Sequence, residues 1–527
     1  MYLSEVLLDY HVYARAQAGE SMRIVVKGRW LLYGCGNDRK VIKNGGLCID
    51  EGIVIDIGTY EDILHKHRAD EVIGSERHLI MPGLVNSHNH GMGLSTIQKG
   101  MKAEPLEIRV HTYARHLFDV DTYYDTLLSA IKQIESGITC TTNHHYSVDP
   151  TDFSEYMIDL EKSMQGWIDS GMRVVFAPII QNQNKYVYGN NEDFISKLPR
   201  EVRKRFVFSE NTSLGAKNYF KAFENLFEDY QGYEGRVNVH LGPSGPQWCS
   251  DDLLEKIRDV ARRKQTGIHI HLLQTLYEKQ YALNEYGKTM VEHLNELDFL
   301  GPNVCCVHCN YLTKEDIRTI AQTRSAVVHN PSANLKLYGG VAPVLLMKKR
   351  GVQLSLGTDG NGLNDDEDMF QEMRLCQILH RAPGIAAKGL DSNEILEMAT
   401  VGGGKATRFV DVGTLEIGKK ADVILVDMER AFYSPFMSKH LSVQDVILQR
   451  VKALDVDTVI INGEIVMKNK RFTRLNKKEV LGKVERSVKQ TETQTPDAEA
   501  EKYLKELKQH IASFFAKWNK HAARAQH

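Results

Sequence analysis

The chain has 527 residues, of which 42% are hydrophobic and 25% charged, and its formal net charge is -2 at pH 7. This composition predicts a globular protein with an ample core, and the near-neutral charge excludes a field that would gather nucleic acid or an anionic membrane. No apolar stretch is long enough to cross a bilayer and no charged-then-apolar signal opens the chain. We therefore expect a cytoplasmic protein whose eight cysteines are reduced thiols.

The two ends of the chain predict a second unit beside the main domain. Residues 1–21 form an N-terminal extension to which the sequence gives no role. Residues 22–78 have the pattern of short strands separated by turns, and residues 408–475 repeat it. Neither segment is long enough for a robust core of its own, so we expect both to form one joint β-sandwich.

Between these flanks, residues 79–407 alternate short β-branched runs with helical segments. The strand candidates are 79–86, 138–143, 173–179, 236–241, 267–272, 303–308, 325–330 and 353–359. Eight such strands with helical crossovers predict a (β/α)8 TIM-like barrel, an α/β fold whose active site lies at the C-terminal ends of the strands.

Several of the predicted strands end in side chains that bind metals. His88 and His90 follow the first run, and because side chains alternate along a strand, both imidazoles lie on one face. Later runs end in His271, His308 and Asp359. Three imidazoles and a carboxylate around a divalent ion leave one position open for water, as a catalytic site requires. The pattern predicts His88, His90, His271 and Asp359 as the metal ligands.

Six motifs follow one another along the chain: PGLVNSHNHG, HIHLLQT, CVHCNYLTKEDI, HNPSANLKL, LGTDGNGLNDD and GTLEIGKKADVILVD. Their order and wording resemble the amidohydrolase superfamily, and within it the aminohydrolase and chlorohydrolase branch. This branch includes triazine hydrolases, methylthioadenosine/S-adenosylhomocysteine deaminases and guanine deaminases. The resemblance covers roughly residues 22–470. It implies the barrel and the joint sandwich, but it does not specify a substrate.

The resemblance also implies catalytic roles. His308 is expected to orient the attacking water and to stabilise developing charge, and Asp359 to bind the metal and take a proton from that water. We expect one divalent ion per chain, zinc with ferrous iron as the alternative, because no strand-end lysine motif indicates a bridged binuclear site.

The sequence departs from this branch at Gln274. The related deaminases carry a glutamate three residues after the histidine that corresponds to His271, and this glutamate protonates the leaving nitrogen. An amide neither gives nor takes a proton near neutral pH, so Gln274 can only hydrogen bond to substrate or water. Another group would then carry the proton, with Asp359, His308, His144 or His145 as the candidates.

The loops after the predicted strands offer further candidates for substrate binding. These are Gln98, His144, His145, Asn330 and Asn334. For each of them, a hydrogen bond that stabilises a loop is an equally good interpretation.

The last segment, 476–527, is expected to contain a polar linker, QTETQTPDAEAE, and then an amphipathic helix. Apolar side chains recur at helical spacing from Tyr503 to Trp518. We expect this stripe to pack on the chain's own barrel or on a sister subunit, and the protein to be a homo-oligomer.

Three functions are compatible with these patterns. The first is metal-dependent hydrolysis of a non-peptide C–N bond in a small amide, urea, carbamate or N-substituted heterocycle, by hydroxide that the ion makes available. The second is deamination of a purine- or triazine-like ring. The third is a non-catalytic barrel scaffold, which the intact set of His88, His90, His271, His308 and Asp359 speaks against.

Overall fold

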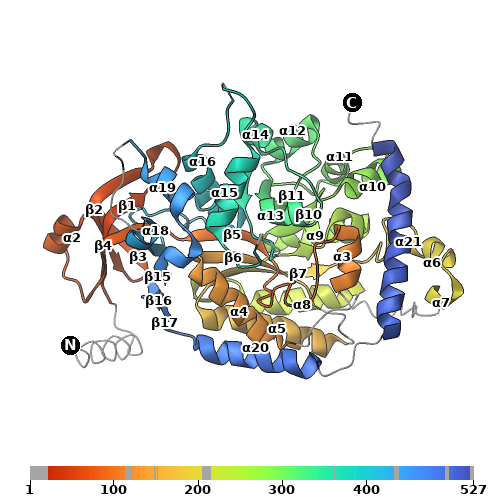
Figure 1. Ribbon diagram of the computed structural model, residues 1–527, viewed down its shortest axis with the longest axis horizontal. Coiled ribbons are helices and arrows are strands. Elements are labelled where there is room, and N and C mark those ends of the chain that lie inside the picture. The colour runs from red at the N-terminus through yellow and green to blue at the C-terminus, as the bar shows by residue number, and fades with distance from the viewer. Residues whose placement is uncertain are drawn as a thin grey trace.

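The computed structural model has two parts joined side by side, a helix-covered barrel and a separate sheet at one end (Figure 1). It describes residues 22–113, 120–147, 150, 152–203, 215–360, 364–385, 387–432, 438, 440–492 and 498–522. The N-terminal extension of residues 1–21 lies outside this range.

Eight strands with parallel pairing form the barrel. They are β5 (Leu84–Asn89), β6 (Ile138–His145), β7 (Arg173–Ile180), β8 (Val237–Val239), β10 (Ile268–Leu272), β11 (Val304–His308), β12 (Ala326–His329) and β13 (Gln353–Leu356). They belong to two sheets, β5 to β8, with the short β9 (Gly242–Pro243) pairing on β7, and β10 to β13. Leu241 pairs with Ile268 on one side, and on the other Asp359 N–H donates to the His88 carbonyl at 2.9 Å. These contacts connect the sheets, and the barrel-type α/β fold is confirmed.

A strand occupies each of the eight predicted positions, but the first barrel strand begins later in the chain than predicted. The apolar run from Leu79 onward is divided between two sheets: it completes β4 (Glu71–Pro82), and the barrel begins with β5 at Leu84. Gly83 lies between them, where a Cβ atom would collide with the side chain of Thr139. A glycine is therefore required where the chain passes from one sheet to the other.

Helices follow the strands and cover the barrel. They include α3 (Leu106–Tyr113), α4 (Thr122–Glu135), α5 (Phe153–Ser170), α8 (Gly215–Tyr230), α9 (Asp251–Lys264), α10 (Leu276–Tyr286), α11 (Met290–Glu296), α12 (Lys314–Thr323), α13 (Pro331–Lys336), α14 (Val344–Lys349), α15 (Met369–Leu379), α16 (Ser392–Met398) and α17 (Val401–Ala406). The other helices before the C-terminal pair are α2 (Tyr60–Lys66), α6 (Asn191–Ser196), α7 (Arg200–Arg203), α18 (Met428–Phe432) and α19 (Val443–Arg450).

Helix caps fix the loops at the functional end of the barrel. α10 starts at Thr275, whose side chain accepts from the N–H of Glu278 while the Glu278 carboxylate accepts from the N–H of Thr275. α12 starts with the same reciprocal pair, Thr313 and Asp316. Such caps satisfy amide donors that a helix leaves open. Each cap therefore holds the turn that leads out of β10 or β11.

Strands from both chain ends form the second unit, a single eight-stranded sheet. β1 (Ile24–Tyr33), β2 (Lys40–Asp50), β3 (Ile53–Thr59) and β4 lie in it beside β14 (Val423–Asp427), β15 (Val456–Ile461), β16 (Glu464–Lys468) and β17 (Arg471–Phe472). β4 pairs with β1 in parallel and with β14 in antiparallel. The joint unit thus exists as one sheet, while a sandwich of two packed sheets stays a prediction.

A buried ion pair links the sheet to the barrel. Arg173, the first residue of β7, donates to both carboxylate oxygens of Asp422, and each side chain is only 1% exposed. Removing one partner would leave an unpaired buried charge, which is strongly destabilising. The relative position of the two units is therefore held by a contact that tolerates little change.

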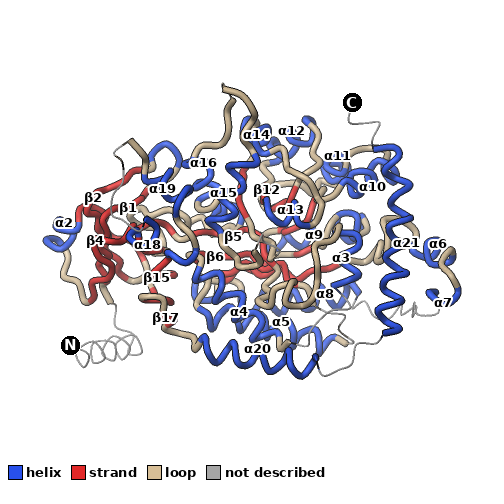
Figure 2. The backbone as a smooth tube through the Cα atoms, in the orientation of Figure 1, coloured by secondary structure: helices blue, strands red, loops and turns tan. Residues whose placement is uncertain are grey.

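Two helices end the described chain (Figure 2). α20 (Lys477–Glu492) packs Val480 and Val484 on α4, in a region where the sequence predicted only the start of a polar linker. α21 (Ala498–Ala522) buries the predicted apolar stripe against the chain's own barrel, at α3 and α10. None of the helices in the described part is long and apolar enough to cross a membrane.

Candidate active site

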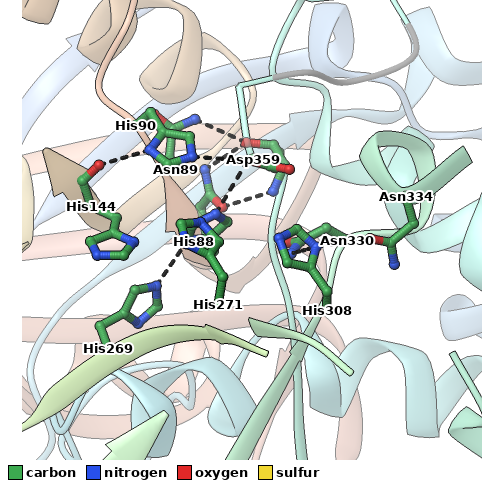
Figure 3. A network of polar contacts seen from close by, with 12 residues as sticks. His88, Asn89, His90, His144, His269, His271, His308, Asn330, Asn334 and Asp359 are labelled. Carbon is green, nitrogen blue, oxygen red and sulfur yellow. Dashed lines mark hydrogen bonds and ion pairs between the residues drawn. The ribbon is translucent and has the colours of Figure 1, made fainter. Parts of the chain in front are cut away.

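Four histidines and an aspartate meet at the C-terminal ends of the barrel strands (Figure 3). His88 lies at the end of β5 and His90 just beyond it, His271 lies in β10, His308 ends β11, and Asp359 follows β13. All but His90 are buried, and the His90 side chain is 15% exposed. Residues far apart in the sequence therefore converge where this fold places its active sites.

Asp359 is the centre of this cluster. Its Oδ1 atom lies 3.2 Å from the Nε2 atom of His88 and 3.2 Å from that of His90. Burial raises the pKa of the Asp359 carboxyl, but the adjacent imidazoles of His88 and His90 lower it more, so the pKa lies well below its ordinary value. The carboxylate is therefore ionised and available to a cation.

The Nδ1 atoms of His90 and His271 are hydrogen-bonded to neighbouring backbone groups. His90 Nδ1 donates to the carbonyl of His144 at 2.8 Å, and His271 Nδ1 donates to the carbonyl of Ser244. A carbonyl only accepts, so these Nδ1 atoms carry the hydrogen and Nε2 of a neutral ring carries a lone pair. Both rings are thus oriented as metal-binding imidazoles are in proteins.

His88 is held by another histidine, His269. The two rings are stacked with centroids 5.1 Å apart, and His88 Nδ1 lies 2.9 Å from His269 Nε2. Of the two histidines in the motif HIHLLQT, the sequence predicted only His271 as a metal ligand. Because side chains alternate along a strand, His269 and His271 lie on the same face of β10. His269 is one layer deeper in the barrel than His271, and it contacts His88 there.

His308 lies on the other side of Asp359 and is held by two asparagines. Its Nδ1 atom lies 2.8 Å from Asn334 Oδ1 and 3.2 Å from Asn330 Nδ2. The shorter contact favours Nδ1–H donating to Asn334, which leaves a lone pair on Nε2. Burial lowers the pKa of His308 to about 3, so the ring is neutral at pH 7 and its Nε2 lone pair can accept a hydrogen bond.

The backbone at this edge is strained as well. His308 has φ 77° and Asp359 has φ 61°, values in the left-handed region that residues other than glycine adopt at a cost. Outliers of this kind cluster at functional sites, where the surrounding structure imposes them. Here both belong to predicted catalytic residues.

The side-chain nitrogens of His144 have no hydrogen-bond partner among the described residues, and the ring is fully buried. Its centroid lies 4.7 Å from that of His271 and 6.0 Å from that of His90. Burial and the neighbouring His271 keep its pKa well below the ordinary value. His144 is thus a neutral ring that faces the cluster, as the pocket prediction requires.

The donor set fits a divalent ion. Within the described chain, His88, His144 and His271 place their ligand atoms within 4.8 Å of one another, and so do His88, His308 and Asp359. A tetrahedral ion with bonds of about 2.0–2.1 Å separates its nitrogen and oxygen ligands by about 3.3 Å. The 3.2 Å contacts of Asp359 match that separation.

Two of the predicted pocket residues face elsewhere. His145, next to His144 on β6, points to the other side of the strand, where its Nε2 atom lies 2.8 Å from the carboxylate of Asp159 on α5. Gln98 is exposed, and its amide oxygen accepts from Ser95 N–H at 3.0 Å. The structure therefore does not bring His145 to the cluster, and it gives Gln98 a role in a local turn.

Buried carboxyl groups lie beside Gln274. Glu278 accepts from the Gln274 N–H at 3.1 Å, and Glu107 on α3 accepts from the Thr275 hydroxyl. Burial and the nearby Glu107 raise the pKa of Glu278 to about 8, and burial raises that of Glu107. Gln274 itself is 3% exposed. Sequence reasoning missed these acids, because Glu278 resembles an ordinary helix cap and Glu107 precedes it by 171 positions.

Comparison with known proteins agrees with this site. Residues 79–466 match the amidohydrolase family. The 5-methylthioadenosine/S-adenosylhomocysteine deaminase of Caldanaerobacter subterraneus is 32% identical over 85% of this chain and 94% of its own length. The 5'-deoxyadenosine deaminase of Methanosarcina acetivorans is 30% identical over 87% of this chain and 96% of its own length.

Solved structures share the fold at lower identity. A zinc-bound adenosine deaminase from Xanthomonas campestris superposes with a TM-score of 0.75 at 20% identity, covering 89% of this chain and 98% of its own. Atrazine chlorohydrolase from Arthrobacter aurescens in complex with zinc gives a TM-score of 0.73 at 18% identity, covering 88% and 100%.

Proposed function

Because the chain belongs to the amidohydrolase family and two of its relatives are named as deaminases, we propose that it is a metal-dependent deaminase of a purine-like ring. One observation carries the proposal: the side chains of His88, His90, His271, His308 and Asp359 converge at the C-terminal end of the barrel. The scaffold alternative explains neither this convergence nor the strained backbone at His308 and Asp359.

In this proposal His88, His90, His271 and Asp359 hold one divalent ion. We propose zinc, with ferrous iron as the alternative, since imidazole and carboxylate suit both. The zinc in both solved relatives supports this choice. A bound divalent ion lowers the pKa of a water molecule toward about 7 and so supplies a nucleophile at neutral pH.

The remaining steps belong to side chains of this chain. Asp359 accepts a proton from the attacking water through its carboxylate, which is ionised at neutral pH. The neutral ring of His308, whose Nδ1–H donates to Asn334, accepts a hydrogen bond from that water at its Nε2 lone pair and so orients it. Asn334 thus acts through His308 as a positioning residue. The low dielectric constant of a buried site strengthens each of these electrostatic interactions.

The substrate class follows from the two relatives. Both are named as deaminases of adenosines altered at the 5' position, and this chain covers at least 94% of the length of each. We therefore propose a small nucleoside with a modified 5' carbon as substrate. We propose that His144, a buried ring whose side-chain nitrogens have no hydrogen-bond partner in the described chain, contacts the substrate ring.

A second candidate rests on Gln274. An amide at this position cannot protonate a leaving amine, so substrates with better leaving groups would need less help. Hydrolysis of an N-substituted heterocycle, a urea, a carbamate or a simple amide is therefore the alternative.

An ammonia-release screen separates the candidates. Purified protein is incubated with adenosine, 5'-deoxyadenosine, 5'-methylthioadenosine and S-adenosylhomocysteine, and in parallel with N-alkylated purines, ureas and carbamates. The proposal expects turnover of a 5'-modified adenosine that chelation abolishes. Activity confined to the second group supports the alternative, and the absence of turnover with metal-loaded protein on either group would contradict both.

A further inference from the structure

A second buried cluster of metal-binding side chains lies outside the active site. It consists of His329, the last residue of β12, with Cys376 on α15 and His380 just after that helix. His329 and Cys376 are fully buried, and His380 is 6% exposed. We infer that these three residues form a second metal site, which takes zinc.

The geometry suits a tetrahedral ion. The three ligand atoms lie within 4.8 Å of one another, and the Nε2 atoms of His329 and His380 are 3.1 Å apart. Zinc with bonds of about 2.0–2.1 Å to nitrogen and about 2.3 Å to sulfur separates its ligands by about 3.3–3.7 Å. Cys376 and His380 are four positions apart, so both lie on one face of α15. Small side-chain shifts therefore complete the site.

The alternative is a plain hydrogen bond between two imidazoles. That bond satisfies one nitrogen of each ring, but His329 Nδ1 has no hydrogen-bond partner among the described residues and is buried. Leaving a buried polar atom unsatisfied costs free energy. A cation between the two Nε2 atoms does not satisfy Nδ1 of His329, but it gives both Nε2 lone pairs and the Cys376 sulfur a common partner and releases the thiol proton to solvent.

The chemistry of the donors indicates which ion binds. Imidazole and thiolate are both zinc ligands, although two imidazoles and one thiolate also hold copper in electron-transfer sites. The active-site set, by contrast, has no sulfur. Glu372, one helical turn before Cys376, is not a fourth ligand, because its carboxylate accepts from the hydroxyl of Ser332.

The site would connect β12 to α15. His329 directly precedes Asn330, which contacts His308, so an ion here fixes the end of the strand that supports the catalytic ring. Its role is structural, and it adds to the proposed function without depending on it.

Cobalt substitution tests this inference with a readout independent of activity. Thiolate bound to Co²⁺ produces a charge-transfer band in the near ultraviolet, which ligands without sulfur do not. The metal-free full-length protein is loaded with Co²⁺ and with Zn²⁺, and metal per chain is measured by mass spectrometry. We expect two ions per chain and the sulfur band in the unchanged protein.

Variants assign the band to its ligand. Cys376→Ser should remove the band and one of the two ions, and Cys48→Ser, a buried thiol in the other sheet, should keep both. His271→Ala should lose only the active-site ion and keep the band, which separates a failure of this inference from a failure of the proposed function. If Cys376→Ser does not fold, His380→Gln provides the same comparison. The inference is overturned if the unchanged protein lacks the band, or if the band is unchanged in both Cys376→Ser and His380→Gln.

Discussion

The two sides of the active site differ in how they are built. On the metal side, the Nε2 atoms of His88 and His90 lie close to the carboxylate of Asp359. The Nδ1 atom of His88 contacts His269, and that of His90 donates to a backbone carbonyl. On the other side, just after β10, Gln274 lies beside the buried carboxyl groups of Glu107 and Glu278.

The difference shows which part of the reaction is fixed and which varies. Binding an ion and activating water need several ligands in one geometry, and the loss of any one of them disables the site. Moving a proton to a leaving group needs one acid of suitable pKa, which different substrates require to different degrees. We therefore expect changes on the metal side to abolish activity and changes on the Gln274 side to tune it.

The largest effect on stability should come from α21, which packs beside the Gln274 side. Phe515 is 3% exposed, and its ring lies 5.2 Å from that of Tyr188 and 4.8 Å from that of Tyr277. Phe515→Ala should cost about 3–5 kcal/mol of unfolding free energy because it leaves a cavity. Thermal melting measures the cost. Metal content should stay constant, and the less buried Phe514→Ala should cost less.

The next largest effect concerns His308. Because its neutral ring orients the water, His308→Ala should lower kcat by about 100-fold or more while the protein keeps its active-site ion. Asn334→Ala, which removes only the partner of His308 Nδ1, should cost less. Steady-state kinetics with metal analysis checks both. A His308→Ala enzyme with nearly full activity would show that another group orients the water.

A smaller effect is expected at Gln274. Gln274→Ala should lower kcat/KM by about 10-fold or less, since one neutral hydrogen bond contributes about 0.5–1.5 kcal/mol. Gln274→Glu should leave the metal in place and add a titrating group to the pH–rate profile. An alanine variant as inactive as His308→Ala would contradict the division between the two sides. A glutamate variant with a strong gain in ring deamination would indicate that the amide marks a change of substrate.

A further effect is a pH dependence of stability. The pKa of Glu278 is about 8 in the folded chain, above the value of about 4.3 expected when unfolded. Between these values the folded chain binds a proton that the unfolded chain has released, so stability falls as pH rises. Because no group titrates at this position in Glu278→Gln, the variant should lose most of this fall between about pH 5 and pH 8. Denaturant titrations at several pH values that show the same slope in both proteins would refute the prediction.

The sequence predicted the barrel well because its strands are short, buried and apolar, and each ends in a recognisable residue. It misplaced the first strand, because the apolar run from Leu79 to Val85 is continuous in sequence although Gly83 divides it between two sheets. It also missed α20, whose few apolar side chains pack on α4 in a segment of otherwise polar character.

The sequence could predict those residues of the candidate site whose role depends on the side chain itself and on its position along a strand. The carbonyls that hold His90 and His271 leave no trace in the sequence, because any residue supplies a carbonyl. His269 could have been recognised from alternation along β10, since it lies on the same face as His271. His145 was misjudged for the same reason, because adjacent residues on a strand face opposite sides.

The most direct test of the account is reconstitution of the metal-free protein. Chelated wild-type protein and a His271→Ala variant are titrated with zinc, and ammonia release from a 5'-modified adenosine is followed together with the circular dichroism spectrum. The account predicts that zinc restores activity to the wild-type protein and none to His271→Ala, while both keep the same fold. Equal recovery of activity in the two proteins would show that His271 does not hold the catalytic ion and would contradict the account.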